Sequence, residues 1–373
     1  MRILLVALAL LAASPEAATA AGTIRVAIME TAPSAELRGA DIEVAPLGAG
    51  RPACDRCLGW RADAVRAVWT GNAIEVDGRR APRFRLWSGR PIRLAGRDYG
   101  GAIELISTGG GMAVINELPL EVYVVGVLRA EADERWPMEV LRAQAIVART
   151  YAAYHRLLNA NKPFHILASV AHQQFAGRVP AASPMLAAVQ ETAGQVLRLK
   201  GELFPAFYHT ECGGHTEDPR LVFASGNLPA LKPVVCPFSA ESPHFHWARD
   251  LDLTELSDLL RRQGVDVGKL TGLEVAERTP SLRVVAVTLR GTRGLARLRG
   301  NDFRRIAGYD VIKSTLFSVA VDDQKARFAG RGYGHGVGLC QWGAKGMAEH
   351  GYTARQILAF YYPGTTPGML EGR

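Results

Sequence analysis

Glu131 is the first residue of this sequence whose setting suggests chemistry. It lies in the segment RAEADERWPMEV, after an apolar stretch and before a helical pattern. A partly buried carboxylic acid has a raised pKa, because desolvation disfavours its charged form, and a general acid working at neutral pH requires such a raised pKa. The alternative is structural, since glutamates near helix starts interact favourably with the helix dipole. Glu134 and Glu139 fit that role, and the residues alone favour it for Glu131 too.

A glycine-rich segment from 330 to 343 is the second candidate. Its six glycines bracket Arg331, Tyr333, His335 and Gln341. Because glycine lets the backbone approach a ligand or another chain segment closely, the polar side chains between the glycines are expected to line a groove. A single histidine is usually structural, but this one stands beside tyrosine, arginine and glutamine. The segment lacks the Lys-Ser/Thr pair of a nucleotide-binding loop.

Helical patterns lie next to both candidates. Apolar and alanine residues recur on one face from Met138 to Leu158, which predicts a helix packed closely against a neighbour. Arg142 and Arg149, seven residues apart, lie together on another face of that helix. Two further helices are expected at about 343–350 and 353–362, directly after the glycine-rich segment.

The chain from Thr23 to about Leu118 has the pattern of short strands separated by glycine, proline and asparagine. The triple glycine at 109–111 predicts a hairpin turn. Leu120 to Leu128 is either a helix or a buried strand, and 253–263 is an amphipathic helix with Thr254 as its expected cap. These patterns predict an α+β fold. A strand-rich N-terminal portion precedes a mixed α/β region with a groove between the helix after Trp136 and the glycine-rich segment.

The first twenty residues have the three parts of a secretory signal peptide. Arg2 gives a positive start, 3–13 is apolar, and Ala18-Thr19-Ala20 supplies the cleavage signal. A short buried strand is the alternative. No later stretch reaches the roughly 18 apolar residues of a membrane-spanning helix. We therefore expect an exported protein, in the periplasm or cell wall, without a transmembrane segment after cleavage.

The net charge of +8 predicts attraction to anionic polymers. Outside the cytoplasm these are wall polymers and lipid headgroups, so nucleic acid is not an expected partner. Charge alone also fits arginines dispersed over solvated faces, which is the more common arrangement.

Motif by motif, the sequence resembles the SpoIID/LytB family, named after stage II sporulation protein D and an amidase enhancer. The motifs are N-x-L-P-L-E-x-Y-x-x-G-V at 116–127, Glu131, W-P-x-E-x-L-x-A-Q-A-x-x-A-R-T-Y at 136–151, Q-Q-F-A-G at 173–177, C-G-G-H-T-E at 212–217 and the glycine-rich segment. They follow this order over residues 116–367. The expected division is therefore a signal peptide over 1–20, a strand-rich region over 21–115 and a SpoIID-like catalytic domain over 116–373.

This resemblance implies a peptidoglycan lytic transglycosylase, which cuts between N-acetylmuramic acid and N-acetylglucosamine and leaves a 1,6-anhydro end. The catalytic glutamate of the family falls on Glu131. Substrate binding is assigned to Arg142, Gln144, Arg149, Tyr151, Tyr333, His335 and Gln341. Hydrolytic glycosidases generally need two carboxylates, whereas here the substrate's own 6-hydroxyl is the nucleophile. One carboxyl therefore suffices, and the chemistry requires no cofactor.

Five cysteines leave at least one thiol free, intermolecular or metal-bound. Some members of the family have a zinc site of cysteine and histidine near the active cleft. A structural zinc would take its ligands from His209, Cys212, His215, Cys236 and Cys340, with His172 as a further candidate. The alternative is a Cys212–Cys236 disulfide, which export permits.

Cys54 and Cys57 form a separate C-x-x-C motif. It is read as a local disulfide or as a distant contribution to a metal site, rather than as a redox motif, because no thioredoxin-like strand-to-helix context surrounds it.

Two further functions compete with the transglycosylase. One is a non-enzymatic wall-binding protein that activates a separate cell-wall amidase, and the other is a scaffold in a wall-remodelling complex. Glu131, Arg149, Tyr333 and His335 are all present, which favours the enzyme. The expected partners are peptidoglycan glycan strands and, for the activator, an amidase.

Overall fold

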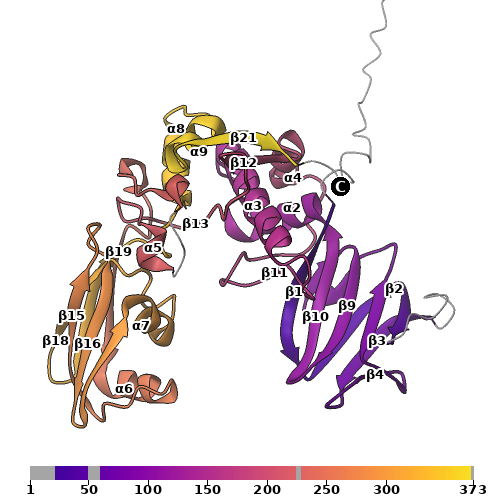
Figure 1. Cartoon of the computed structure of the whole chain (residues 1–373), viewed down its shortest axis with the longest axis horizontal. Helices are drawn as coiled ribbons and strands as arrows, with labels where there is room; N and C mark the ends of the chain where they lie inside the picture. Colours follow the sequence, from indigo (N-terminus) through magenta and orange to yellow (C-terminus); the bar gives the residue numbers. More distant parts are fainter. Residues whose placement is uncertain (1–21, 49–58, 224–227, 371–373) are drawn as a thin grey trace, which may run out of the picture. The chain divides into compact units, whose positions relative to one another are not determined.

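The computed structural model describes residues 22–48, 59–223 and 228–370 (Figure 1). The expected signal peptide and the Cys54–Cys57 motif lie outside the described residues. The described chain forms two compact units. The first unit holds the residues up to Glu131, Ala152–Val196 and those from Gly368 onward, and the second unit holds Ala132–Tyr151 and Leu197–Pro367.

The first unit is built on a mainly antiparallel sheet, ordered β11-β1-β10-β9-β6-β2-β3-β4-β5, with β7 and β8 pairing beside β2. Its strands are β1 (Thr23–Ala32), β2 (Ser34–Leu47), β3 (Trp60–Trp69), β4 (Ile74–Val76), β5 (Arg79–Ala81), β6 (Arg83–Trp87), β7 (Ile92–Leu94), β8 (Arg97–Tyr99), β9 (Ala102–Thr108), β10 (Gly111–Pro119) and β11 (Ile166–Leu167). The expected hairpin joins β9 to β10 in register, with Thr108 opposite Gly111. The expected boundary between residues 115 and 116 falls within β10.

Helix α2 (Leu120–Glu131) begins directly where β10 ends. The sequence allowed either a helix or a buried strand for this run. The structure is helical, and six consecutive residues from Tyr123 to Leu128 are buried. Helix α4 (Pro184–Glu191) packs beside α2 in the same unit. Its start is capped by Ser183, whose hydroxyl accepts from the Met185 N–H.

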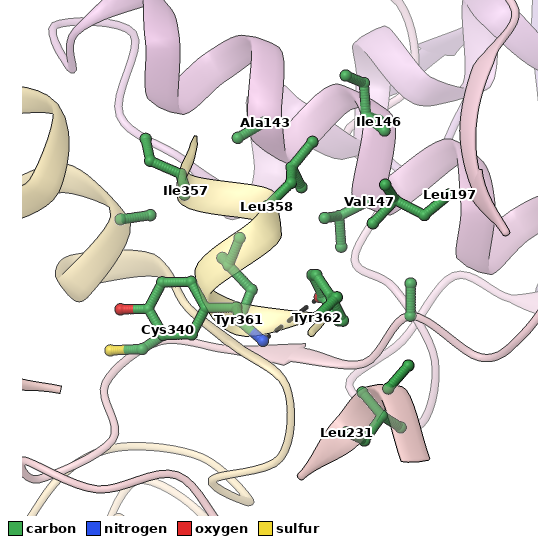
Figure 2. Packing of buried hydrophobic residues seen from close by; sticks show 14 of the residues in the cluster. Ala143, Ile146, Val147, Leu197, Leu231, Cys340, Ile357, Leu358, Tyr361 and Tyr362 are labelled. Carbon is green, nitrogen blue, oxygen red and sulfur yellow. Dashed lines mark hydrogen bonds between the residues drawn. The ribbon is translucent and has the colours of Figure 1, made fainter. Parts of the chain in front are cut away.

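Helix α3 (Met138–Leu158) carries the chain from the second unit into the first. Its second-unit half supplies Ala143, Ile146 and Val147 to a core that also contains Ile357 and Leu358 of α9 (Figure 2). The other elements that contribute to this core are β12 (Gln195–Leu199), β13 (Tyr208–His209), α5 (Pro219–Val222), two short 3-10 turns (Pro229–Leu231 and Pro237–Ser239), β20 (Leu339–Cys340), α8 (Gln341–Glu349) and α9 (Ala354–Tyr361). Strand β21 (Thr365–Met369) pairs with β12.

A second hydrophobic core of the second unit lies among two three-stranded sheets and two helices. These elements are β14 (His246–Asp252), α6 (Leu253–Arg262), β15 (Leu270–Arg278), β16 (Val284–Gly291), β17 (Gly294–Arg299), α7 (Gly300–Ala307), β18 (Phe317–Val321) and β19 (Lys325–Arg331). Helix α6 was predicted, but its expected cap was wrong. Asp252 caps it, because the Asp252 carboxylate accepts from the Thr254 and Glu255 N–H groups.

The α+β fold class is confirmed, since helices and strands occur in both units and the described strands form several sheets. Among the described residues, no helix is both long enough and apolar enough to span a bilayer.

Candidate functional site

Helix α2 holds the segment 173–177 against its side. The Tyr123 hydroxyl donates to Gln173 Oε1 at 3.1 Å, and the Tyr123 and Phe175 rings lie 5.1 Å apart. The Ala176 N–H donates to the Gly126 carbonyl at 3.1 Å. The two motifs that the sequence placed about fifty residues apart therefore form one packed structure.

Gly126 makes this close approach possible. A Cβ atom on Gly126 would lie 2.4 Å from the Phe175 ring and 2.5 Å from the Gly177 carbonyl oxygen. Both distances are far below van der Waals contact. The glycine within the α2 motif is thus explained by packing against the 173–177 segment rather than by backbone flexibility.

Glu131 is the final residue of α2 and is half-buried. Its Oε1 atom accepts a hydrogen bond from the Gln174 backbone N–H at 2.7 Å. The N–H stabilises the carboxylate, whereas the negative end of the α2 dipole disfavours a charge there. Glu131 therefore lies at the end of a helix, whereas the sequence suggested a position near a helix start. Its side chain is held by the 173–177 segment, which itself packs against α2.

The α3 residues that the sequence analysis assigned to substrate binding differ in burial. Arg142 is half-buried and donates to Glu139, whose other oxygen accepts from the Ala354 N–H of α9 at 2.6 Å. Gln144 and Arg149 are only 1% and 0% exposed. The buried Nε2 of Gln144 has no hydrogen-bond partner among the described residues, while the Arg149 Nη1 contacts the Ala145 carbonyl at 3.4 Å.

Tyr151, at the end of this half of α3, packs edge-on against Phe207 at 5.7 Å. Phe207 in turn contacts the His335 ring at 5.9 Å. The structure thus brings the α3 motif and the glycine-rich segment together through an aromatic cluster in the second unit. Gln341 is the buried first residue of α8.

His335 is held as a neutral imidazole. Its Nδ1 accepts from the Val337 N–H at 3.0 Å, and its ring lies 5.2 Å from Phe223 and 5.5 Å from His209. Burial, followed by the charge of Arg304 and Arg283, lowers the pKa of His335 to about 3. Because the His335 ring is neutral and packed, it is better suited to shape the site or to form hydrogen bonds than to transfer protons.

A buried hydrogen-bond network that contains two charged residues, and that the sequence did not indicate, lies beneath this segment. Arg283 is 1% exposed and donates to the Cys212 carbonyl at 2.6 Å. Glu217, 2% exposed, accepts from Thr279 at 2.6 Å and from Ser281. These partners are more than sixty residues apart along the chain, so no local pattern could have revealed them.

Cys212, Cys236 and Cys340 all belong to the core around α9, where Figure 2 labels Cys340. Their sulfur atoms all lie within 4.8 Å of one another, and each residue is at most 1% exposed. The strand pair β13–β20 helps to position Cys340 because it aligns that residue with His209. All three are free thiols, so the structure does not contain the alternative Cys212–Cys236 disulfide.

Hydrogen-bond donors surround these sulfur atoms. The Cys212 and Gly343 N–H groups point at Cys340 Sγ at 3.2 and 3.3 Å, and the Tyr361 hydroxyl lies 3.0 Å from Cys236 Sγ. Hydrogen bonds from Cys212 and Cys340, aided by Tyr361, lower the pKa of Cys236 to about 3. This environment favours at least one thiolate, the form of cysteine that binds metals.

The three cysteines fit zinc, whereas the candidate histidines do not complete the group. Sulfur atoms about 2.3 Å from a tetrahedral zinc ion lie roughly 3.8 Å apart, within the observed spacing. A Cβ on Gly343 would lie 2.5 Å from Cys236 Sγ, so glycine keeps this space open. The ring nitrogens of His209 and His215 are not among the ligand atoms that lie within 4.8 Å of one another.

His172 lies in the first unit, with its ring 5.0 Å from that of His155. It is not among the described residues whose ligand atoms all lie within 4.8 Å of one another, which are the three cysteines.

Comparison with protein families gives two matches. Residues 108–199 match the SpoIID family, described as stage II sporulation protein. Residues 237–338 match a domain of unknown function. The first match contains Glu131 and the α2, α3 and 173–177 segments, and the second contains β14–β19 and part of the glycine-rich segment.

Three relatives extend this likeness. An uncharacterized protein of Brachyspira hyodysenteriae is 34% identical over 73% of this chain and 72% of its own length. The stage II sporulation protein D of Bacillus subtilis is 29% identical over 67% of this chain and 75% of its own. The amidase enhancer of Bacillus subtilis is 29% identical over 65% of this chain, but only 39% of its own length is covered.

Proposed function

Because the chain belongs to the SpoIID family, we propose that it is a lytic transglycosylase acting on the glycan strands of peptidoglycan, with Glu131 as its general acid and base. The observation that carries this proposal is the placement of Glu131 at the end of α2, held by the Gln174 N–H. The carboxyl is half-buried, and its position is fixed by packed motifs rather than by a mobile surface.

The proposed reaction uses one carboxyl in two steps. Glu131 donates its proton to the glycosidic oxygen as the bond from that oxygen to the anomeric carbon of N-acetylmuramic acid breaks. The 6-hydroxyl oxygen of the same sugar then bonds to the anomeric carbon, and its proton returns to Glu131. The products are a 1,6-anhydro end and a free 4-hydroxyl, and no water is consumed.

Product analysis tests this reaction class. Purified glycan strands would be incubated with the protein, and the released fragments would be measured by mass spectrometry. Anhydro ends support the transglycosylase. Reducing ends, which carry one added water, would instead indicate a hydrolase, and intact strands would contradict cleavage of either kind.

The expected location follows from the same proposal. A signal peptide over residues 1–20 would deliver the protein to the periplasm or cell wall, where its substrate lies. A fusion that carries residues 1–40 on a reporter enzyme would be exported, and replacement of the apolar run 3–13 by polar residues would retain the reporter in the cytoplasm.

A second candidate function is activation of a cell-wall amidase without glycan cleavage. The 29% identity to the amidase enhancer favours this alternative. The chain would then speed a purified amidase on peptidoglycan while the glycan strands remained intact. Acceleration of the amidase by a Glu131→Gln variant would separate this function from transglycosylase activity.

We also propose that Cys212, Cys236 and Cys340 bind one structural zinc ion. The donor set, the burial and the space beside Gly343 support this assignment. Bound zinc would link the β13–β20 strand pair to the start of α8 and to the start of the 3-10 turn at Pro237–Ser239. It would stabilise the fold and take no part in the chemistry.

A further inference from the structure

The glycine-rich segment is held along one side by residues 244–245 and 313–316. The Gly334 N–H donates to the Lys313 carbonyl at 2.9 Å, and the Arg331 N–H donates to the Leu316 carbonyl at 2.9 Å. The Gly332 N–H points at the His244 and Phe245 carbonyls, 3.2 Å from each. The region that matches a domain of unknown function therefore positions Tyr333 directly.

Within this region, Asp310 fixes the direction of the Tyr333 hydroxyl. The hydroxyl donates its hydrogen to Asp310 Oδ1. Tyr333 is half-buried, whereas Asp310 is exposed. With its only hydrogen used, the phenol oxygen offers lone pairs alone, so it can accept but not donate a hydrogen bond to a ligand. Burial and then Asp310 raise the pKa of Tyr333 to about 12, which keeps the phenol protonated.

Two further groups meet Tyr333 beside Asp310. The Lys313 ammonium lies 5.6 Å from the centre of the Tyr333 ring and 3.3 Å from His244 Nδ1. The His244 ring lies 5.1 Å from that of Tyr333. Burial and Lys313 lower the pKa of His244, so its ring is neutral at pH 7. The Tyr333 hydroxyl oxygen, the Asp310 carboxylate and the Lys313 ammonium therefore lie close together at a partly exposed site.

We propose that Asp310 is a positioning residue that presents Tyr333 as a hydrogen-bond acceptor for an N–H or O–H group of a glycan. The region over residues 237–338 thereby supplies part of a glycan-binding site, and Lys313 provides a neighbouring donor. Sugars with N-acetyl groups carry both amide N–H and hydroxyl donors, which suit this arrangement. The identification of the ligand as a glycan rests on the proposed function.

Calorimetric binding of a defined glycan tests this role without turnover. The probe is a tetrasaccharide of alternating N-acetylglucosamine and N-acetylmuramic acid without stem peptides, titrated into a Glu131→Gln parent. Asp310→Ala, Tyr333→Phe and their double variant are compared in that background. Asp323→Ala is the matched control, because Asp323 is also exposed but lies in the turn between β18 and β19.

Asp310→Ala is expected to weaken binding by up to roughly 10-fold, the scale of one neutral hydrogen bond. The double variant should bind no more weakly than Tyr333→Phe alone, because Asp310 acts through that tyrosine. Ultraviolet titration should also show that Asp310→Ala lowers the pKa of Tyr333. The Asp323→Ala variant should match the parent.

Unchanged binding by Asp310→Ala, or losses that simply add in the double variant, would overturn the proposal. Failure of the parent to bind the tetrasaccharide would overturn it too. A wild-type protein that binds the glycan but releases no anhydro ends would reject the proposed chemistry while leaving the role of Asp310 intact.

Discussion

The Gln174 backbone N–H donates to the Glu131 carboxylate at 2.7 Å, and both residues are placed by α2. Glu131 ends that helix, while Gln174 belongs to the 173–177 segment that packs against Tyr123 and Gly126. The position of the proposed acid therefore depends on packing several residues away from it.

Gly126→Ala tests this dependence. The added methyl group would crowd Phe175 and the Gly177 carbonyl, so we expect the free energy of unfolding to fall by about 1–3 kcal/mol. Glycan cleavage should fall as well, because the 173–177 segment shifts away from Glu131. Chemical denaturation and product release would be measured together. Gly110→Ala is the control, since its Cβ meets open space, and equal behaviour of the two variants would count against this packing argument.

Gly336→Ala should destabilise the second unit through Arg283. A Cβ there would lie 2.5 Å from the Arg283 guanidinium carbon, and the backbone has a φ of +86°. Gly351 has nearly the same φ, +85°, with no heavy atom within 4 Å of a Cβ. Gly351→Ala therefore measures the backbone cost alone, about 1 kcal/mol. Thermal unfolding should show a clearly larger loss for Gly336→Ala, and equal losses would refute the crowding of Arg283.

Stability should decline as the pH falls below about 6.5, the ordinary pKa of an unfolded histidine. His335 has a folded-state pKa of about 3, so between these values the unfolded chain binds a proton that the folded chain does not. Unfolding is then favoured by acid, and the stabilising contribution is complete above pH 6.5. Urea denaturation at pH 7 and pH 5 would measure it. His335→Phe should show a smaller loss on acidification than the wild type, and an unchanged pH dependence would contradict a neutral His335.

The purified protein should contain about one zinc ion per chain. Elemental analysis should show that Cys212→Ser, Cys236→Ser and Cys340→Ser each lose the metal, while Cys54→Ser retains it. A chelator should lower the melting temperature of the wild type and change that of Cys340→Ser little. Protein without metal, together with a Cys212–Cys236 disulfide found by mass spectrometry, would establish the alternative.

The sequence predicted most of the helices, the N-terminal strands and the family, because these depend on local periodicity and on motif order. It misplaced the cap of α6, since Asp252 and Thr254 are both good capping residues and only the backbone decides between them. The Asp310–Tyr333 and Glu217–Ser281 contacts were missed. Each joins segments that only tertiary packing brings together.

The cysteine group was only partly predicted. Ligand type suggested five candidates, and the structure brings three of them together. His209 and His215 lie on neighbouring segments, but their ring nitrogens are not among the ligand atoms that lie within 4.8 Å of one another. Spacing along the chain identifies residues that can bind a metal, whereas the direction of each side chain depends on the fold around it.

The most direct measurement is the release of anhydro-muramyl ends by Glu131→Gln. Glutamine keeps the size of the side chain and an oxygen that can accept from Gln174, but it cannot donate a proton as the acid does. Mass spectrometry of glycan digests should show at least a roughly 100-fold loss of anhydro ends, the lower range for removing a general acid, with glycan binding retained. Glu134→Gln, the exposed control, should act like wild type. Undiminished release by Glu131→Gln would contradict the assignment of Glu131 as the catalytic acid.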